Sequence, residues 1–210
     1  MPDILLASAS PRRRELLASL GFESRVVPQD IDETRFDHLP PGERVVALAR
    51  AKAKSAYGAQ EAKGTLIIAA DTLVCNPDPA SIPAGDFSDS SGAVTLGKPR
   101  DREEAGRMIR MLAGRAHTVY TGIAVIDATR GLEEFALSTS MVRFCTLSGA
   151  ELEGYLDSGE WEGVAGAYRI QGLAAVFIEE MRGSWSGIVG LPIRELYAIL
   201  SRLSIQVPAL

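Results

Sequence analysis

Three consecutive arginines stand in the first turn of an expected helix, within the stretch LASASPRRRELLASLGF over residues 6–22. Cations are disfavoured at this position because the N-terminal end of a helix already carries partial positive charge. A bound anion would offset that charge, and phosphate suits both free helix N–H groups and bidentate guanidinium groups. We therefore expect Ser8, Ser10, Arg12 and Arg13 to surround a phosphate. The alternative is that the arginines point into solvent or pair with acidic neighbours.

A carboxylate, Asp71, closes the apolar run GTLIIAAD over residues 64–71, which is typical of a strand buried on both faces. An ionised carboxylate in that position is costly to desolvate unless it meets a cation, a metal or a hydrogen-bond donor. Ligands collect at the carboxyl ends of strands in α/β proteins, so we expect a catalytic or metal-binding role for Asp71. The structural alternative is an Asx turn in which Asp71 caps the following residues.

Four further polar residues could complete a site for phosphate, metal and water chemistry: Glu33, Lys52, Lys98 and Gln171. Each of the charged ones also has an ordinary interpretation. Glu33 could be a surface charge, Lys52 could extend from its helix into solvent, and Lys98 could be a turn residue. Phosphate chemistry nevertheless needs such a mixture of acids and bases in one cleft.

The elements that would position these residues alternate between strands and helices. Apolar runs predict strands over 3–8, 64–71, 117–127, 133–145 and 172–180, with the third and fourth joined as a hairpin. Helical periodicity predicts helices over 11–20, 42–57, 101–113, 148–156 and 191–203. Asp101 with Glu104 and Ser148 with Glu151 predict capping boxes for two of them, and Gly114 predicts a helix stop. The last of these helices should turn Tyr197 inward, and RGSWSG at 182–187 should be a turn. This mixture predicts an α/β or α+β protein with a mixed sheet.

Composition limits the function classes further. The 210 residues are 46% hydrophobic, which suffices for one sizeable domain or one body with two lobes. A net charge of -5 disfavours a general affinity for nucleic acid or for anionic membrane surfaces. No apolar run approaches the roughly 20 residues that span a bilayer, and the opening MPDILLASAS does not resemble a signal peptide. We expect a cytoplasmic protein with two buried structural thiols, Cys75 and Cys145.

Six motifs carry a resemblance to a known family. In chain order they are LASASPRRRELL, DIDET, LARAKA, AADTLV, LGKP and AGAYRIQG, and they cover nearly the whole chain. The sequence resembles the Maf family of septum-formation-inhibitor-like nucleotide pyrophosphatases. The resemblance implies a single domain over 1–210, with an elongated two-lobed α/β fold, a central cleft and often a homodimer. It also implies similarity to the inosine triphosphate pyrophosphatases.

The implied reaction is hydrolysis of a nucleoside triphosphate between its α- and β-phosphates, giving a monophosphate and pyrophosphate with a divalent cation, Mg²⁺ or Mn²⁺. By position in the motifs, Asp71 matches the proton acceptor and Glu33 an acidic residue near the metal. The positions that match phosphate-handling residues are Ser8, Arg12, Arg13, Lys52 and Lys98. The positions associated with base selectivity in the branch acting on dTTP and UTP are Arg12, Thr72 and Gln171. A sister branch acts on 7-methyl-GTP.

The sequence departs from the family pattern in two places. Gly163 and Val164 stand where many members have an aspartate and a lysine, and Arg169 replaces a glycine in AGAYRIQG. If Arg169 supplies the missing cation, it should contribute to triphosphate binding. The Pro-, Ser- and Gly-rich segment 76–94 is longer than the usual short hairpin and is expected to be a flexible insertion.

Together these residues predict a mechanism in which Glu33 and Asp71 hold the metal and Asp71 orients or deprotonates water. The amide of Gln171 can match the O4 and N3–H edge of uracil and thymine, which predicts UTP, dTTP and 5-methyl-UTP ahead of CTP and purines. The alternative function is a non-catalytic nucleotide-binding regulator of cell division. A carboxylate at residue 71 favours the enzyme, because it would hinder simple binding of a polyanion.

Overall fold

The computed structural model describes residues 3–58, 64–76 and 94–209. These residues form a seven-stranded mixed sheet in which β1 runs parallel to β2 and β3, and every other pairing is antiparallel. Along the sheet the order is β2 (Ser24–Val26), β1 (Asp3–Leu6), β3 (Thr65–Asn76), β5 (Ala116–Asp127), β6 (Leu132–Phe144) and β7 (Ile178–Arg182). Strand β4 (Val94–Leu96) pairs with the end of β3.

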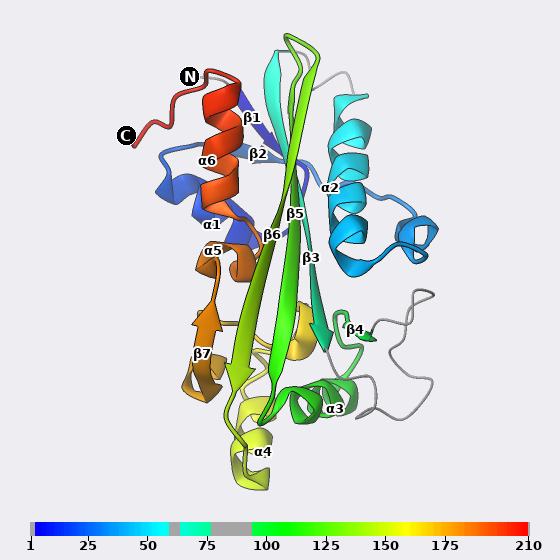
Figure 1. Cartoon of the computed structure of the whole chain (residues 1–210), viewed down its shortest axis with the longest axis vertical. Coiled ribbons are helices and arrows are strands. Elements are labelled where there is room, and N and C mark those ends of the chain that lie inside the picture. The colour runs from blue at the N-terminus through cyan, green and yellow to red at the C-terminus, as the bar shows by residue number, and fades with distance from the viewer. Residues whose placement is uncertain (1–2, 59–63, 77–93, 210) are drawn as a thin grey trace.

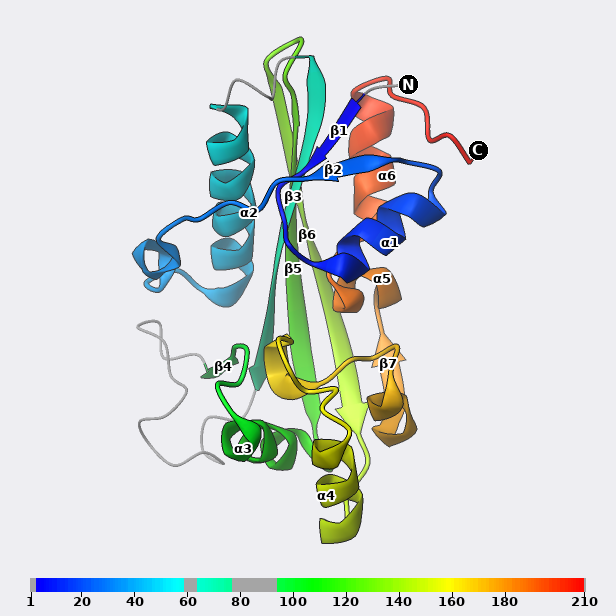
Figure 2. The same cartoon turned by 180° about the vertical axis from the view of Figure 1, so that it is seen from behind.

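The helices divide between the faces of the sheet (Figures 1 and 2). Helix α2 (Pro41–Tyr57) covers one face, and α1 (Pro11–Ser19), α5 (Trp185–Val189) and α6 (Ile193–Arg202) lie on the other. Helices α3 (Arg102–Leu112) and α4 (Gly149–Asp157) pack at the far end of the long strands. The result is an elongated α/β molecule with two lobes that share β3, β5 and β6. No helix within the described ranges combines the length and apolar character of a membrane span.

Alternation along β3 sends its side chains to two separate cores. Ile67 and Ala69 face the alanine-rich side of α2, where Ala49 and Ala53 are fully buried. Ile68 and its even-numbered neighbours face the larger core beneath α1, α5 and α6. The predicted burial of this strand on both faces is confirmed.

A close approach between α2 and β5 depends on Gly122. A Cβ atom built on Gly122 would lie 2.6 Å from the backbone nitrogen of Val46 and closer still to the carbonyl of Val45. Gly122 pairs directly with Asp71 of β3, so the helix descends onto the sheet at the level of the expected catalytic residue. Glycine at this position therefore sets the distance between α2 and that carboxylate.

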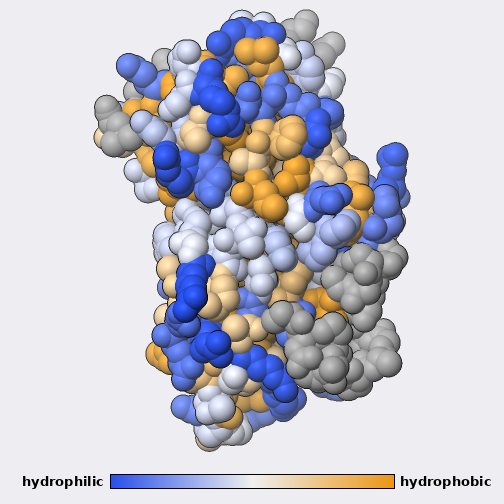
Figure 3. Space-filling view, viewed as in Figure 1, coloured by the Kyte–Doolittle hydropathy of each residue, from blue (hydrophilic) through white to orange (hydrophobic). Residues whose placement is uncertain are grey.

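Figure 3 shows hydrophobic residues gathered on the exposed face between α2 and β6. Phe135 and Leu137 of β6 are 47% and 42% exposed. Leu137 also lines a shallow groove together with Leu39 and Val46. Phe135 and Leu137, with Leu39 and Val46 beside them, form an apolar patch on this face.

Local signals predicted many elements correctly. The helices over 11–20 and 42–57, the hairpin β5–β6 and the capping box of Ser148 with Glu151 are confirmed. Gly114 adopts a positive φ of 70° just after α3, as expected for a helix stop. Asp101 caps α3, but Glu104 bonds Arg100 rather than completing a capping box.

Other predictions were wrong. The strand over 64–71 continues to Asn76, so Asp71 lies in mid-strand, because pairing with β5 extends to Cys75 opposite Thr118. The strand predicted over 172–180 is a 3-10 helix from Leu173 to Phe177, and β7 begins only at Ile178. The turn predicted over 182–187 contains the start of α5.

Two more predictions concern the last helix and the expected insertion. Tyr197 was expected inside, yet it is 41% exposed, and Leu196, Ile199 and Leu200 form the buried face of α6. Asn76 and Val94, the ends of the expected insertion, pair with each other across β3 and β4. Residues 77–93 lie outside the described residues, so the insertion itself stays a prediction.

Replacing Gly122 with alanine should destabilise the protein by about 3 kcal/mol, since overpacking against helix backbone cannot relax by rotating a side chain. Gly154→Ala is the matched control, because Gly154 is exposed in α4 and its added Cβ would meet nothing within 4 Å. Urea unfolding of the two variants measures the difference. Equal stability of Gly122→Ala and wild type would contradict the proposed close approach.

Candidate active site

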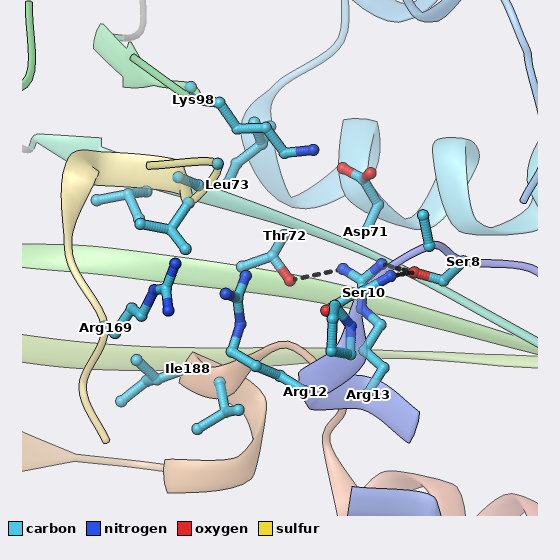
Figure 4. Close-up of a pocket in the computed structure, with 18 of the residues that line it drawn as sticks. Ser8, Ser10, Arg12, Arg13, Asp71, Thr72, Leu73, Lys98, Arg169 and Ile188 are labelled. Atoms are coloured by element: carbon cyan, nitrogen blue, oxygen red, sulfur yellow. Dashed lines mark hydrogen bonds between the residues drawn. The ribbon is translucent and has the colours of Figure 1, made fainter. Parts of the chain in front are cut away.

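The cleft lies at a gap in the pairing of β3. On one edge of this strand, β1 pairs as far as Ile68 and β4 pairs from Val74. Between these two partners, 69–73 have no neighbouring strand on that edge within the described part of the chain. A cleft of about 790 Å³ occupies this gap, lined by the segments that follow β1 and β4 (Figure 4).

Asp71 forms the centre of a charged cluster on the α2 side of the sheet. Lys52 of α2 donates to Asp71 Oδ1 at 2.6 Å, and the same Nζ lies 2.7 Å from Glu33 Oε1. The Asp71 side chain is only 12% exposed, while that of Glu33 is 50% exposed. Burial raises the pKa of Asp71, although Lys52 and then Arg13 oppose the shift. A carboxylate with a raised pKa is a stronger proton acceptor.

Arg13 has a different environment from the one expected. Its Nε donates to the carbonyl of Gly190 at 2.8 Å, and its terminal nitrogens donate to Ser8 Oγ at 2.8 Å and Thr72 Oγ1 at 3.3 Å. Burial lowers the pKa of Arg13, with Asp71 acting against that shift. These bonds tie α1 to β3 and to the end of α5. Arg13 therefore builds the cleft wall, in addition to any contact with a ligand.

The N-terminus of α1 is open to an anion. Ser10 is the N-cap residue, yet its side chain makes no capping bond, and its own N–H donates to Ser8 Oγ at 3.3 Å. Pro11 occupies the first helical position and has no N–H. Within the described residues, the amides of Arg12 and Arg13 have no hydrogen-bond acceptor. Both amides could therefore bind a phosphate oxygen.

The remaining predicted residues reach the same cleft from the other lobe. Lys98 follows β4 and points into the cleft in Figure 4. Gln171, which is exposed, also lines it. Gly163 and Val164, the two departures from the family pattern, line it too. Arg169 lies beside Arg12, near Ile188 (Figure 4).

The structure thus brings every predicted site residue into one cleft: Ser8, Arg12, Arg13, Glu33, Lys52, Asp71, Thr72, Lys98 and Gln171. Their chemical roles stay predictions. Sequence reasoning missed two groups that shape the site. Gly190 supplies a carbonyl to Arg13, and the hydroxyl of Thr121 is hydrogen-bonded to that of Thr72 at 3.0 Å. Neither belongs to a polar motif, so nothing in the sequence distinguished them.

The two carboxylates fit a divalent cation that also binds substrate. Asp71 and Glu33 both direct an oxygen at one point, which the ammonium of Lys52 occupies. Mg²⁺ is usually held by one or two carboxylates together with phosphate oxygens and water. Across the residues that the structure describes, no group of three or more His, Cys, Asp or Glu side chains could hold a metal.

Comparison with known proteins decides the family. The family model described as Maf-like protein matches residues 3–203. The chain belongs to the Maf family. A dTTP/UTP pyrophosphatase from Moorella thermoacetica is 42% identical over 208 residues, covering 99% of this chain and 98% of the relative. A dTTP/UTP pyrophosphatase from Treponema denticola is 39% identical over 210 residues, covering 99% of this chain and all of that relative.

Among solved structures, a HAM1 protein from Coxiella burnetii aligns over 96% of this chain and all of its own, with 19% identity and a TM-score of 0.48. This low similarity adds nothing to the functional assignment of the Maf family member described here.

The adjacent arginines of α1 should differ in their effect on stability. Arg13→Ala removes three hydrogen bonds from a charged donor and should cost about 2 kcal/mol. Arg12→Ala removes none in the described structure and should change stability by less than about 0.5 kcal/mol. Urea unfolding at neutral pH measures both variants. The assignment of Arg13 to the cleft wall fails if the two substitutions cost the same.

Proposed function

We propose that this protein hydrolyses dTTP and UTP to the monophosphate and pyrophosphate. One observation carries the proposal: a buried carboxylate, Asp71, lies in the same cleft as an open helix N-terminus and several cationic side chains. The anion-binding groups suit a triphosphate, and the carboxylate suits activation of water. The names of the relatives from Moorella thermoacetica and Treponema denticola support the choice of nucleotide.

In the proposed mechanism, the phosphates lie along Ser8 and the N-terminus of α1, where the free backbone amides of Arg12 and Arg13 donate to a phosphate oxygen. Lys98 contributes a further positive charge from the opposite lobe. Asp71 accepts a proton from the water that attacks the α-phosphorus. The bond between this phosphorus and the α–β bridging oxygen breaks, and pyrophosphate leaves. Lys52 offsets the charge that develops on the phosphate oxygens.

We further propose that Asp71 and Glu33 hold Mg²⁺ or Mn²⁺ when substrate is bound. The cation would supply positive charge to the phosphate oxygens and help to orient the water. Lys52 already lies between the two carboxylates, so this point of the cleft favours a positive charge. On binding of the metal, the Lys52 ammonium would move toward the phosphates.

The base is proposed to lie toward Gln171, whose amide offers one donor and one acceptor. Uracil and thymine share the O4 and N3–H edge that such an amide can match, and their triphosphates should be preferred, with 5-methyl-UTP, over CTP. Thr72 lies in the same cleft, where its hydroxyl oxygen accepts from Arg13. Its proton is directed at Thr121 Oγ1, because the single hydroxyl proton of Thr121 is donated to the carbonyl of Gly187. A role for Thr72 beside Gln171 in base selection stays part of the proposal.

Two properties beyond the reaction are also proposed. One is a cytoplasmic location, and the acidic composition supports an absence of nucleic-acid partners. A homodimer is supported by the apolar patch of Phe135 and Leu137, which a second copy of the chain would cover. Light scattering at several protein concentrations measures the assembly, and a monomer throughout would contradict the homodimer.

Asp71→Asn should reduce pyrophosphate release from UTP by about 10²- to 10⁴-fold, since it removes the proton acceptor while keeping the shape of the side chain. The assay uses dTTP, UTP, CTP, the purine triphosphates and 7-methyl-GTP, with Mg²⁺ or Mn²⁺ added. Wild type that binds UTP but releases pyrophosphate from none of them would instead favour a non-catalytic regulator.

Stability provides a control for this variant. Because burial raises the pKa of Asp71, the folded protein binds this proton more tightly than the unfolded chain does. Ionisation of Asp71 therefore lowers stability as the pH rises above the ordinary carboxyl pKa of 3.8. Asp71→Asn should melt at or above the wild-type temperature at pH 7, with a smaller advantage near pH 4. A large loss of stability at pH 7 would mean that misfolding explains the lost activity.

Gln171→Leu tests base selection. The substitution removes both hydrogen-bonding groups while roughly keeping the volume of the side chain, so discrimination between UTP and CTP should fall by about tenfold. The affinity for pyrophosphate should stay within twofold of wild type. Steady-state kinetics with both nucleotides gives the ratio of kcat/KM. An unchanged ratio would exclude Gln171 from base selection.

A further inference from the structure

Two arginines from distant parts of the chain face each other in the cleft. Arg12 projects from the first turn of α1, and Arg169 projects from the segment between Tyr168 and Gly172 that joins two short 3-10 helices. In Figure 4 the two guanidinium groups lie side by side, near Ile188. The charge of Arg169 contributes, after burial, to lowering the pKa of Arg12.

Most hydrogen-bonding capacity of this pair is unused. Arg169 donates one bond, from Nη2 to the carbonyl of Glu162 at 3.1 Å, and its buried Nε has no acceptor. Arg12 makes no hydrogen bond to any residue that the structure describes. Arg13, one residue further along α1, uses three nitrogens on protein acceptors. The contrast indicates that Arg12 and Arg169 are directed at something other than the protein.

The charges of the pair are also unbalanced. Burial and then Arg169 lower the pKa of Arg12, and Glu15 only partly opposes these effects. Glu15 and Glu162 line the same cleft, but within the described chain neither makes an ion pair with Arg12 or Arg169. Two partly buried cations without a counter-ion destabilise the folded protein. An oxyanion between them would relieve the repulsion and match two planar donor forks.

The pair lies apart from the proposed catalytic cluster. In Figure 4, Arg169 and Ile188 stand at one end of the view, and Asp71 and Ser8 stand at the other. The end with Arg169 has an apolar wall from Ile188, which suits the face of a pyrimidine ring. An oxyanion held there need not be the phosphate that contacts the N-terminus of α1.

We propose that Arg12 and Arg169 form a second oxyanion site of the cleft, beyond the phosphate site at the N-terminus of α1. The proposal rests on the function proposed above. Two parts of a substrate carry the required chemistry: the terminal phosphates of the triphosphate, and a carboxylate attached to the pyrimidine ring. In either case Arg169 is a binding residue that acts together with Arg12.

Calorimetric titration without divalent metal tests the site separately from turnover. The probes are pyrophosphate, UMP and 5-carboxy-UMP, titrated into wild type, Arg169→Gln and Arg169→Lys. The control is Arg182→Gln, because the side chain of Arg182 is 74% exposed and pairs with Glu180 outside the cleft. A charged hydrogen-bonded contact corresponds to about tenfold or more in affinity.

The titrations distinguish the two possible sources of the oxyanion, the terminal phosphates and a carboxylate on the base. If terminal phosphates occupy the site, Arg169→Gln should weaken pyrophosphate binding about tenfold and leave 5-carboxy-UMP and UMP equal in affinity. If a base carboxylate occupies it, wild type should bind 5-carboxy-UMP about tenfold more tightly than UMP, and Arg169→Gln should abolish this preference. In both cases Arg169→Lys should restore the effect in part, because lysine keeps the charge without the fork.

The proposal is overturned if Arg169→Gln binds all three probes within twofold of wild type. Failure of the proposed function would look different. In that case the wild-type protein would release no pyrophosphate from any triphosphate, while the titrations could still reveal an oxyanion held by Arg12 and Arg169.

Discussion

The ion pair between Lys52 and Asp71 is the interaction on which the cleft depends. Its 2.6 Å contact joins a helix on one face of the sheet to the middle of a central strand. Burial of the carboxylate is unfavourable by itself, and the lysine only partly compensates for it. The pair forms only because α2 lies close to β5, where Gly122 leaves room for the helix backbone. The close packing of α2 on β5 therefore determines where the ammonium of Lys52 meets the carboxylate of Asp71.

A second constraint holds the opposite wall. Arg13 joins the residue after β1, the middle of β3 and the end of α5 through three hydrogen bonds. These segments come from widely separated parts of the chain. The guanidinium of Arg13 therefore holds three separate elements together in one wall of the cleft. Its neighbour Arg12 is left without a protein partner in the described structure. Adjacent residues of identical type thus have different environments: Arg13 is bonded into the wall of the cleft, and Arg12 is the one that we propose binds substrate.

The sequence allowed good predictions where the determinants are local. Pro11 and Gly21 bound a helix, Ser148 and Glu151 cap another, and the alternation of β5 and β6 indicates a hairpin. The candidate site residues were also found, because motif resemblance places them in one cleft. The geometry around them was not predictable. A carboxylate after an apolar run looks like a strand end, yet pairing with β5 carries β3 beyond Asp71.

The different environments of Arg12 and Arg13 could not be predicted from the sequence either. They differ by about 100° around the helix, and the positions of Ser8, Thr72 and Gly190 determine which one is bound to the protein. Gly190 lies 177 residues from Arg13 in the chain. Likewise, the 3-10 turn over Leu173–Phe177 has the apolar composition of a strand. In each case the tertiary partner, rather than local propensity, decides the outcome.

The continuous hairpin β5–β6 has a consequence for how the molecule can move. Its strands pair without interruption from Ala116 opposite Arg143 to Asp127 opposite Leu132, along the length that joins the two lobes. A hinge needs a few residues free to change φ and ψ, and a paired strand provides none. Rotation of one lobe against the other would have to twist the whole sheet elastically. Admission of substrate and release of product therefore fall to the segments at the rim of the cleft, which can rearrange while the lobes keep their relative position.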